Sequence, residues 1–313
     1  MPGKKFYIRF VYWLVILPAL AVACGTIDAT PGASPSPLAT QTAGPTATFT
    51  PTPFPPSPTP LPLAATVNGQ GITQAEFQAE LARFQAAQVE DAGVSSSEAE
   101  ERVLNDLINQ ELLAQAGGEN GFVLAEDELV EKLDQLVEKA GGQEAFSSWL
   151  ADQGYTEDSF KVAFARSTAA AWMRDEILAK MPDQVEQVHA RQILLYNSDQ
   201  AQQALQQLES GSDFETLAAT YNPTTGGELG WFPRGYLTVP ELEEAAFSLQ
   251  PGEHSDIIES NIGYHILQVI EREPNRSLDA GARLALKEKA LQDWLELRRD
   301  QSEIVILLSE RSD

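Results

Sequence analysis

The chain has 313 residues, a formal net charge of −25 and a sequence pI near 4.4. Nucleic acids and anionic lipid surfaces bind proteins through basic patches, so this acidic excess argues against both as partners. The sequence holds three histidines, which are far apart, and one cysteine. Because neither residue type shows a metal-ligand spacing, we expect no metal site.

The N-terminal segment has the order of a secretory signal. Basic residues that include Lys4 and Arg9 precede an apolar run that begins at Phe10 and is shorter than a membrane-spanning helix. Small residues end this run directly before Cys24, which is similar to a bacterial lipobox, where the thiol is acylated and the chain is cut before it. We therefore predict a lipoprotein signal over 1–23 and an extracytoplasmic protein that is anchored to the cell membrane by lipid on Cys24. An ordinary signal peptide with an incidental cysteine is the alternative.

Residues 24–63 are predicted to form a lipid-anchored linker. Between residues 30 and 62 nearly every position is Pro, Thr, Ser, Ala or Gly, a composition that cannot bury a core. Pro-rich chain spans about 3.1 Å per residue when extended, so this tether would hold the folded part up to roughly 100 Å from the membrane.

The segment 64–184 is predicted to be an all-helical frame. Apolar residues recur at helical spacing, for example around Leu107, and the glycine pair at 117–118 marks a helix end. The pattern Ser97-x-x-Glu100 is typical of a capping box, which predicts that a helix begins there.

After residue 184 the sequence pattern includes strands. The expected elements, in chain order, are a strand at 188–195, helices at 199–209 and 214–221, a strand at 229–232, a helix at 241–249, and strands at 256–259 and 264–270. This β-α-α-β-α-β-β order predicts one small α+β domain over 185–272.

The remaining segment, 273–313, is predicted to return to the helical frame. It contains an amphipathic helix at 280–299 and then an apolar run at 304–308. A single helix has no core of its own, so we expect it to pack on the frame. The α+β domain would then be an insertion into a helical domain.

Several motifs in the α+β domain resemble the parvulin family of peptidyl-prolyl cis-trans isomerases. They are VHARQILL at 188–195, GGELGWFPRG at 226–235, VPELEEAAF at 239–247, LQPGE at 249–253 and GYHIL at 263–267. Together these motifs cover the domain from end to end. The resemblance implies a parvulin-type fold for 185–272.

The flanking segments carry a looser resemblance. ATVNG at 65–69 and GYTEDSF at 154–160 are similar to the helical chaperone part of SurA-type proteins and of PrsA-type foldase lipoproteins. Such proteins hold and help to fold exported polypeptides. The resemblance therefore implies that the partners are unfolded or partly folded exported polypeptides that contain proline.

The reaction implied by the resemblance needs no covalent step and no cofactor. Rotation about an X-Pro bond has to break amide resonance, a barrier of about 18–20 kcal/mol. A catalyst can hold proline in a dry apolar pocket and favour the twisted amide by hydrogen bonding. By resemblance the pocket is formed by Leu237, Leu242 and Phe247, the first two standing where the family often has Met and Phe.

The resemblance also implies a polar part of the site, made of His265, Gln192 and Thr224. The family usually has two histidines at the first two positions, and the glutamine found here can still donate and accept hydrogen bonds. Strand alternation points the neighbouring His189 to the opposite face from Gln192. The loop before Gly226 is shorter than in the family and lacks its usual acidic or thiol group, which leaves Thr224 as the nearest polar side chain.

Three functions follow from these observations. The first is an extracytoplasmic foldase that isomerises X-Pro bonds in exported polypeptides. The second is a chaperone whose parvulin-type domain holds clients with little or no catalysis, which the glutamine at position 192 and the short loop favour. The third is a structural lipoprotein of the envelope that uses the fold for docking.

Overall fold

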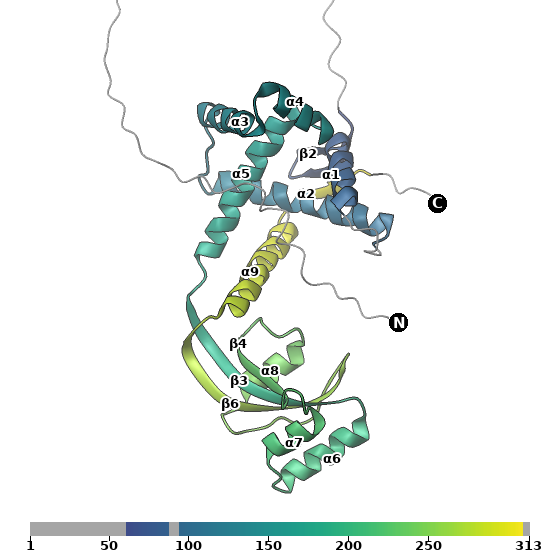
Figure 1. Ribbon diagram of the computed structural model, residues 1–313, viewed down its shortest axis with the longest axis vertical. Coiled ribbons are helices and arrows are strands. Elements are labelled where there is room, and N and C mark those ends of the chain that lie inside the picture. The colour runs from purple at the N-terminus through teal and green to yellow at the C-terminus, as the bar shows by residue number, and fades with distance from the viewer. Residues whose placement is uncertain (1–60, 88–93, 309–313) are drawn as a thin grey trace, which may run out of the picture. The chain divides into compact units, whose positions relative to one another are not determined.

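The computed structural model describes residues 61–87 and 94–308 (Figure 1). The predicted signal at 1–23, Cys24 and most of the predicted linker lie outside the described residues. None of the helices within the described ranges combines the length and the apolar character that crossing a bilayer requires.

The first part of the described chain is mainly helical. Its helices are α1 (Gln74–Ala87), α2 (Ser96–Glu119), α3 (Glu126–Ala140), α4 (Gln143–Asp152) and α5 (Glu157–Ala179). The capping box of α2 is made by Ser95 and Glu98, with the Glu98 amide donating to Ser95 Oγ at 3.2 Å and the Ser95 amide donating to Glu98 Oε2 at 3.1 Å. The capping residue predicted at Ser97 was therefore wrong by two positions, because three consecutive serines allow several starting points.

A small sheet accompanies these helices. Its strands are β1 (Leu63–Val67), β2 (Gln70–Thr73) and β7 (Ile304–Ile306), in the order β2-β1-β7. Asn68 and Gly69, with φ of 51° and 81°, form the turn between β1 and β2, as is usual for a two-residue hairpin loop. The expectation of an all-helical frame is corrected in this respect. These strands have only three to five residues, and β7 comes from the far end of the chain.

The sheet and the first two helices share a core. Its buried residues include Ala65 and Val67 of β1, Phe77 of α1 and Ile108 of α2, and Ile304 packs against it. Burial of these apolar side chains on both the sheet and the helices stabilises their association. The contact between β7 and this core brings the C-terminal residues back to the beginning of the described chain.

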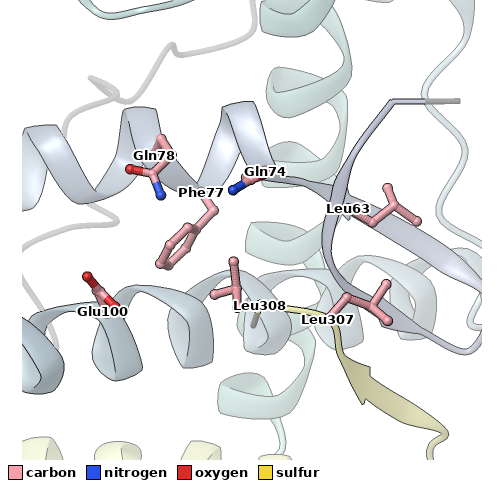
Figure 2. A pocket seen from close by; sticks show the side chains of 7 residues that line it. All are labelled: Leu63, Gln74, Phe77, Gln78, Glu100, Leu307 and Leu308. Carbon is pink, nitrogen blue, oxygen red and sulfur yellow. The ribbon is translucent and has the colours of Figure 1, made fainter. Parts of the chain in front are cut away.

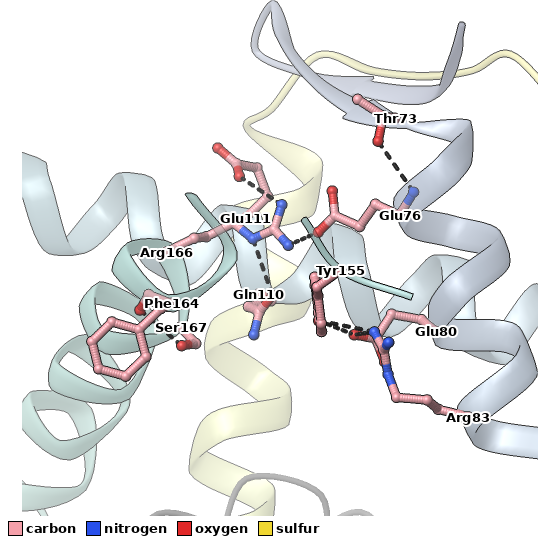
Figure 3. Close-up of polar contacts among 10 residues, drawn as sticks. All are labelled: Thr73, Glu76, Glu80, Arg83, Gln110, Glu111, Tyr155, Phe164, Arg166 and Ser167. Atoms are coloured by element: carbon pink, nitrogen blue, oxygen red, sulfur yellow. Dashed lines mark hydrogen bonds and ion pairs between the residues drawn. The ribbon is translucent and has the colours of Figure 1, made fainter. Parts of the chain in front are cut away.

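A buried ion-pair network connects three helices. The guanidinium of Arg166 on α5 pairs with Glu76 on α1, and lies 3.8 Å from the carboxylate of Glu111 on α2 (Figure 3). Its Nε also donates to Gln110 Oε1 at 3.0 Å. A buried charge is costly unless it is paired and hydrogen-bonded, so this arginine and its partners fix how α1, α2 and α5 pack together.

The second part of the chain is a four-stranded antiparallel sheet with helices on both faces, so the predicted α+β fold class is confirmed. Its elements are β3 (Gln184–Leu195), α6 (Ser198–Glu209), α7 (Phe214–Tyr221), β4 (Glu228–Pro233), α8 (Pro240–Ser248), β5 (Ile258–Ser260) and β6 (Gly263–Ser277), with strand order β4-β3-β6-β5. Buried residues of α6 and α7 pack with Ile193 and Ile266 on one face, whereas those of α8 pack with Ala190 and Leu267 on the other (Figure 1).

Strands β3 and β6 are longer than the sequence pattern predicts. Their pairing extends to Gln184 and Ser277, and the amide of Leu278 then donates to the carbonyl of Asp183 at 3.2 Å. This outer part of the two strands carries mostly polar, partly exposed residues, so the apolar alternation that reveals a strand is weak there. The two ends of the segment 184–277 therefore lie next to each other.

Helix α9 (Ala280–Asp300) follows the second sheet and packs with α2 and α5. Its Leu295 is buried with Leu113, Met173 and Ile177, and Leu291 packs against the same cluster. The predicted division into a frame, from 64–184 and 273–313, and an insertion at 185–272 remains a proposal that this packing supports.

The first prediction tests that division. Residues 184–277 are removed and Asp183 is joined to Leu278 by a short glycine-serine linker, which the hydrogen bond between these residues allows. We expect the shortened protein to remain helical and to melt cooperatively, as measured by circular dichroism. If both this protein and isolated 184–277 are unfolded, the proposed division is wrong.

Candidate functional site

The centre of the candidate site is His265 on β6. This side chain is completely buried, and its position pairs with Leu194 of β3 and Ile258 of β5. Gln192 stands two residues before Leu194 on the same face of β3, and its Oε1 lies 2.8 Å from His265 Nδ1. The structure therefore brings together two of the three predicted polar residues.

Ser260 completes a hydrogen-bonded chain that the sequence analysis missed. Its Oγ lies 2.7 Å from His265 Nε2, so the imidazole is held from both sides. Ser260 is the last residue of β5 and pairs with Gly263, the first residue of β6, across a tight turn. The signal was present in the sequence, because the short turn at 261–262 pairs residue 260 with residue 263, which puts residue 265 diagonally across from residue 260 on the same face of the hairpin.

The two partners fix the tautomer of the neutral imidazole. The amide oxygen of Gln192 accepts from Nδ1–H of His265, and Nε2 then accepts from the hydroxyl of Ser260. Burial lowers the pKa of His265 below its ordinary value, because the charged form loses hydration. His265 is therefore a neutral ring of fixed orientation at neutral pH.

His189 belongs to a separate group on the other face of the sheet. Its ring stacks on Trp231, with centroids 5.3 Å apart, and its Nε2 lies 2.5 Å from Glu228 Oε1. The guanidinium of Arg276 covers Trp231 at 4.1 Å. This half-buried stack does not include His265 or Gln192 among its described contacts.

The three predicted apolar residues lie in one hydrophobic cluster. Leu242 and Phe247 of α8 are each only 5% exposed, and Leu237, in the loop before α8, is partly buried against them. Leu229 of β4, which the sequence analysis did not select, packs against the same cluster. Leu237 and Leu229 are more accessible than the two helix residues, so they are better placed to meet a ligand from solvent.

Glu243 holds the loop that carries Leu237. Its Oε2 accepts hydrogen bonds from the backbone amides of Gly235, Tyr236 and Leu237 at 2.7, 3.1 and 3.3 Å. A carboxylate that accepts several backbone amides fixes their geometry. Sequence reasoning missed this role because a glutamate in the first turn of a helix is common for other reasons.

The short loop before β4 lies against the backbone of Gln192. Gly227 has a φ of 74°, its carbonyl accepts from the Gln192 amide at 2.8 Å, and a Cβ at this position would lie 1.9 Å from the Gln192 carbonyl oxygen. Within this loop the hydroxyl of Thr225 accepts from the Gly227 amide at 3.2 Å, whereas Thr224 is exposed. The structure thus places the loop close to Gln192 but does not join Thr224 to the hydrogen-bonded chain.

Known proteins resemble both parts of the chain. The family described as PPIC-type PPIase domain matches residues 177–271, and the family described as SurA-like N-terminal domain matches residues 44–174. The foldase protein PrsA of Oceanobacillus iheyensis is 31% identical over 218 residues, which cover 65% of this chain and 70% of that protein. PrsA of Caldanaerobacter subterraneus is also 31% identical, over 65% of this chain and 72% of its own length.

One solved structure aligns with about two thirds of the chain. The crystal structure of PrsA, a peptidylprolyl isomerase from Bacillus anthracis, aligns with a TM-score of 0.41 and 22% identity. The alignment covers 63% of this chain and 96% of that one.

The second prediction uses the lowered pKa of His265. Because the unfolded imidazole binds a proton near pH 6.5 and the buried one resists it, the free energy of unfolding should fall as the pH drops below about 6.5. The slope approaches at most about 1.4 kcal/mol per pH unit for one proton. Urea unfolding from pH 7.5 to 5.5 should show this loss in the parent and a shallower slope in His265→Gln. His254→Gln is the control, and equal slopes in the parent and His265→Gln would contradict the prediction.

Proposed function

The chain belongs to the PrsA foldase family, and we propose that it is an extracytoplasmic foldase that isomerises X-Pro bonds in exported polypeptides. The observation that carries this proposal is the neutral His265, held by Gln192 and Ser260 inside the region that matches PPIC-type PPIase domains. Foldases and chaperones of this kind act on unfolded exported polypeptides, which are therefore the expected clients.

The proposed reaction separates into an apolar and a polar contribution. Leu237, Leu242 and Phe247 would hold the proline ring away from water. A twisted amide has lost its resonance and is therefore less polar than a planar one, so a dry apolar pocket favours the twisted form. The chain from Gln192 through His265 to Ser260 would form a rigid polar base beneath the bound amide. Thr224, on the adjacent exposed loop, would reach the amide only when a polypeptide is bound. No step needs a metal or a cofactor.

A second candidate is a chaperone whose parvulin-type domain binds clients and scarcely catalyses. Two features favour it. Thr224 is exposed and lies outside the hydrogen-bonded chain, and Gln192 stands where the resemblance implies a second histidine, so fewer polar groups are available to the twisting amide. A structural envelope lipoprotein that uses the domain for docking is the third. Turnover of a short X-Pro peptide separates the first candidate from the others, and suppression of aggregation of an unfolded protein separates the second from the third.

The third prediction distinguishes the apolar from the polar contribution to catalysis. If the apolar pocket dominates, Leu237→Ala should lower kcat/KM by about tenfold, or about 1.4 kcal/mol, whereas Gln192→His should change it by less than about threefold. If the polar chain limits the rate, Gln192→His should raise kcat/KM clearly, and Thr224→Asp should add to this gain. Isomerase rates on an X-Pro peptide make the comparison.

The buried positions need a control for folding. Leu242→Ala and Phe247→Ala should abolish most turnover, but each also removes core volume, which commonly costs about 2–5 kcal/mol of stability. Their melting curves are therefore measured together with the rates. Folded Leu237→Ala, Leu242→Ala and Phe247→Ala proteins with the turnover of the parent would show that the proline pocket lies elsewhere.

We further propose that Cys24 is the lipid anchor. It is the only cysteine in the sequence and directly follows a short apolar segment that ends in small residues. A chain with this anchor and a Pro/Thr-rich linker would keep its foldase domains near the membrane, where exported polypeptides emerge.

The fourth prediction tests the anchor. Cys24→Ala should leave a protein without lipid, because no other residue in the chain has a thiol to acylate. Metabolic labelling with a radioactive fatty acid should mark the parent and not the variant. Ser57→Ala, within the predicted linker, is the matched control and should retain the label. Label in Cys24→Ala would exclude lipidation at this residue.

A further inference from the structure

The small sheet of the helical frame has a free edge at β7. The order β2-β1-β7 leaves β7 paired with one neighbour among the described residues. The amide of Asn68 donates to Glu303 O, and the amide of Leu307 donates to Ala64 O, each at 2.8 Å. Positions 303, 305 and 307 therefore direct their backbone groups toward β1. Alternation directs the amides and carbonyls of Ile304 and Ile306 away from the sheet.

The side chains along this edge are apolar and exposed. Val305, Ile306 and Leu307 are 41%, 58% and 49% exposed. Ile304 and Leu308, which share a face with Ile306, pack against the core of the frame. An additional strand beside β7 would therefore cover Ile306 and continue the same apolar face.

A pocket lies at the end of this edge. Its volume is about 340 Å³, and it is formed by residues of β1, α1, α2 and the segment after β7 (Figure 2). Figure 2 shows the ring of Phe77 between the two helices, with Leu307 and Leu308 on one side. Glu100 is the one charged residue among the seven that line the pocket. The exposed lining is mainly polar, because Gln74, Gln78 and Glu100 contribute to it, so the pocket can take a basic side chain that flanks an apolar segment.

From these features we propose that β7 is a docking edge for an extended, apolar segment of another polypeptide, with basic flanking residues. Backbone pairing at a sheet edge is independent of the side chains of the added strand, whereas the pocket and Glu100 add a preference. Such a mode suits recognition of many unfolded chains. The proposed docking at β7 uses a surface separate from the isomerase site and does not depend on isomerase activity.

The charge of the protein favours this occupant over a second copy of the chain. Two copies that paired through β7 would bring together chains of formal charge −25 each, with Glu303 beside the edge in both. Like charges at close range oppose such pairing. A segment with lysine or arginine flanks meets the opposite sign.

The fifth prediction is that blocking the outward amide of β7 weakens the binding of an extended peptide. It is tested with the full-length chain in phosphatidylcholine nanodiscs. The probe is a labelled peptide of alternating valine and threonine, with two lysines at each end and no proline, followed by fluorescence anisotropy. Ile306→Pro removes one outward amide and leaves the pairing with β1 intact, because proline is tolerated where the amide faces away from the sheet. We expect the Kd to rise by about tenfold or more. Ile306→Val, which keeps the amide and the branched side chain, should stay within about twofold of the parent.

A second measurement on the parent protein covers the case in which Ile306→Pro does not fold. Alternate amides of an extended peptide point to opposite edges, and an N-methyl group removes the hydrogen-bond donor. A peptide methylated on alternate residues keeps one edge that can pair with β7 and should still bind, whereas a peptide methylated at every residue should not. Equal binding of the fully methylated peptide, or of the peptide to folded Ile306→Pro, would overturn the proposal.

Two further outcomes would assign the edge to another occupant and also overturn the proposal. One is a dimer, detected by light scattering, that Ile306→Pro converts to a monomer. The other is a tenfold gain in peptide affinity when residues 30–62 are deleted, since this would show that the chain's own linker occupies the edge. Because the probe lacks proline, none of these results depends on isomerase activity.

Discussion

The antiparallel pairing of β3 with β6 is the constraint on which most of this structure depends. The two strands are joined from Gln184 and Ser277 at one end to Leu195 and Tyr264 at the other. At the first end the pairing places Ser277 next to Gln184, where the second sheet begins, so α9, which follows, can pack with α2 and α5. At the second end it places Gln192 beside His265. One ladder of backbone hydrogen bonds thus supports both the helical frame and the candidate site.

The candidate site shows how a glutamine can orient a buried imidazole. A glutamine can accept from a neighbouring imidazole as a second imidazole can, and the 2.8 Å contact between Gln192 and His265 has this form. Ser260 holds the opposite nitrogen, so the ring cannot turn. Because His265 is buried and neutral, the site relies on shape and fixed dipoles instead of a formal charge, which agrees with a reaction that breaks no covalent bond.

The two parts of the protein offer different kinds of surface to a polypeptide. The parvulin-type domain presents an apolar cluster next to a rigid polar chain, which together form the proposed site for proline. The frame presents an exposed edge strand with a pocket, suited to extended backbone. A foldase needs both kinds of recognition, because an unfolded client must be held while individual X-Pro bonds, which isomerise in tens to hundreds of seconds, change state.

The sequence by itself determined the local and repetitive features: the α+β class, the helix Phe214–Tyr221 and the order of elements in the parvulin-type domain. Hydrophobic periodicity and cap residues are encoded within a few neighbours, so they can be read directly. Only the tertiary structure decided which distant segments meet. β7 pairs with β1 across more than 200 positions, and Ser260 reaches His265 only through the hairpin of β5 and β6. Such contacts arise from packing and strand register, which short segments of sequence do not specify.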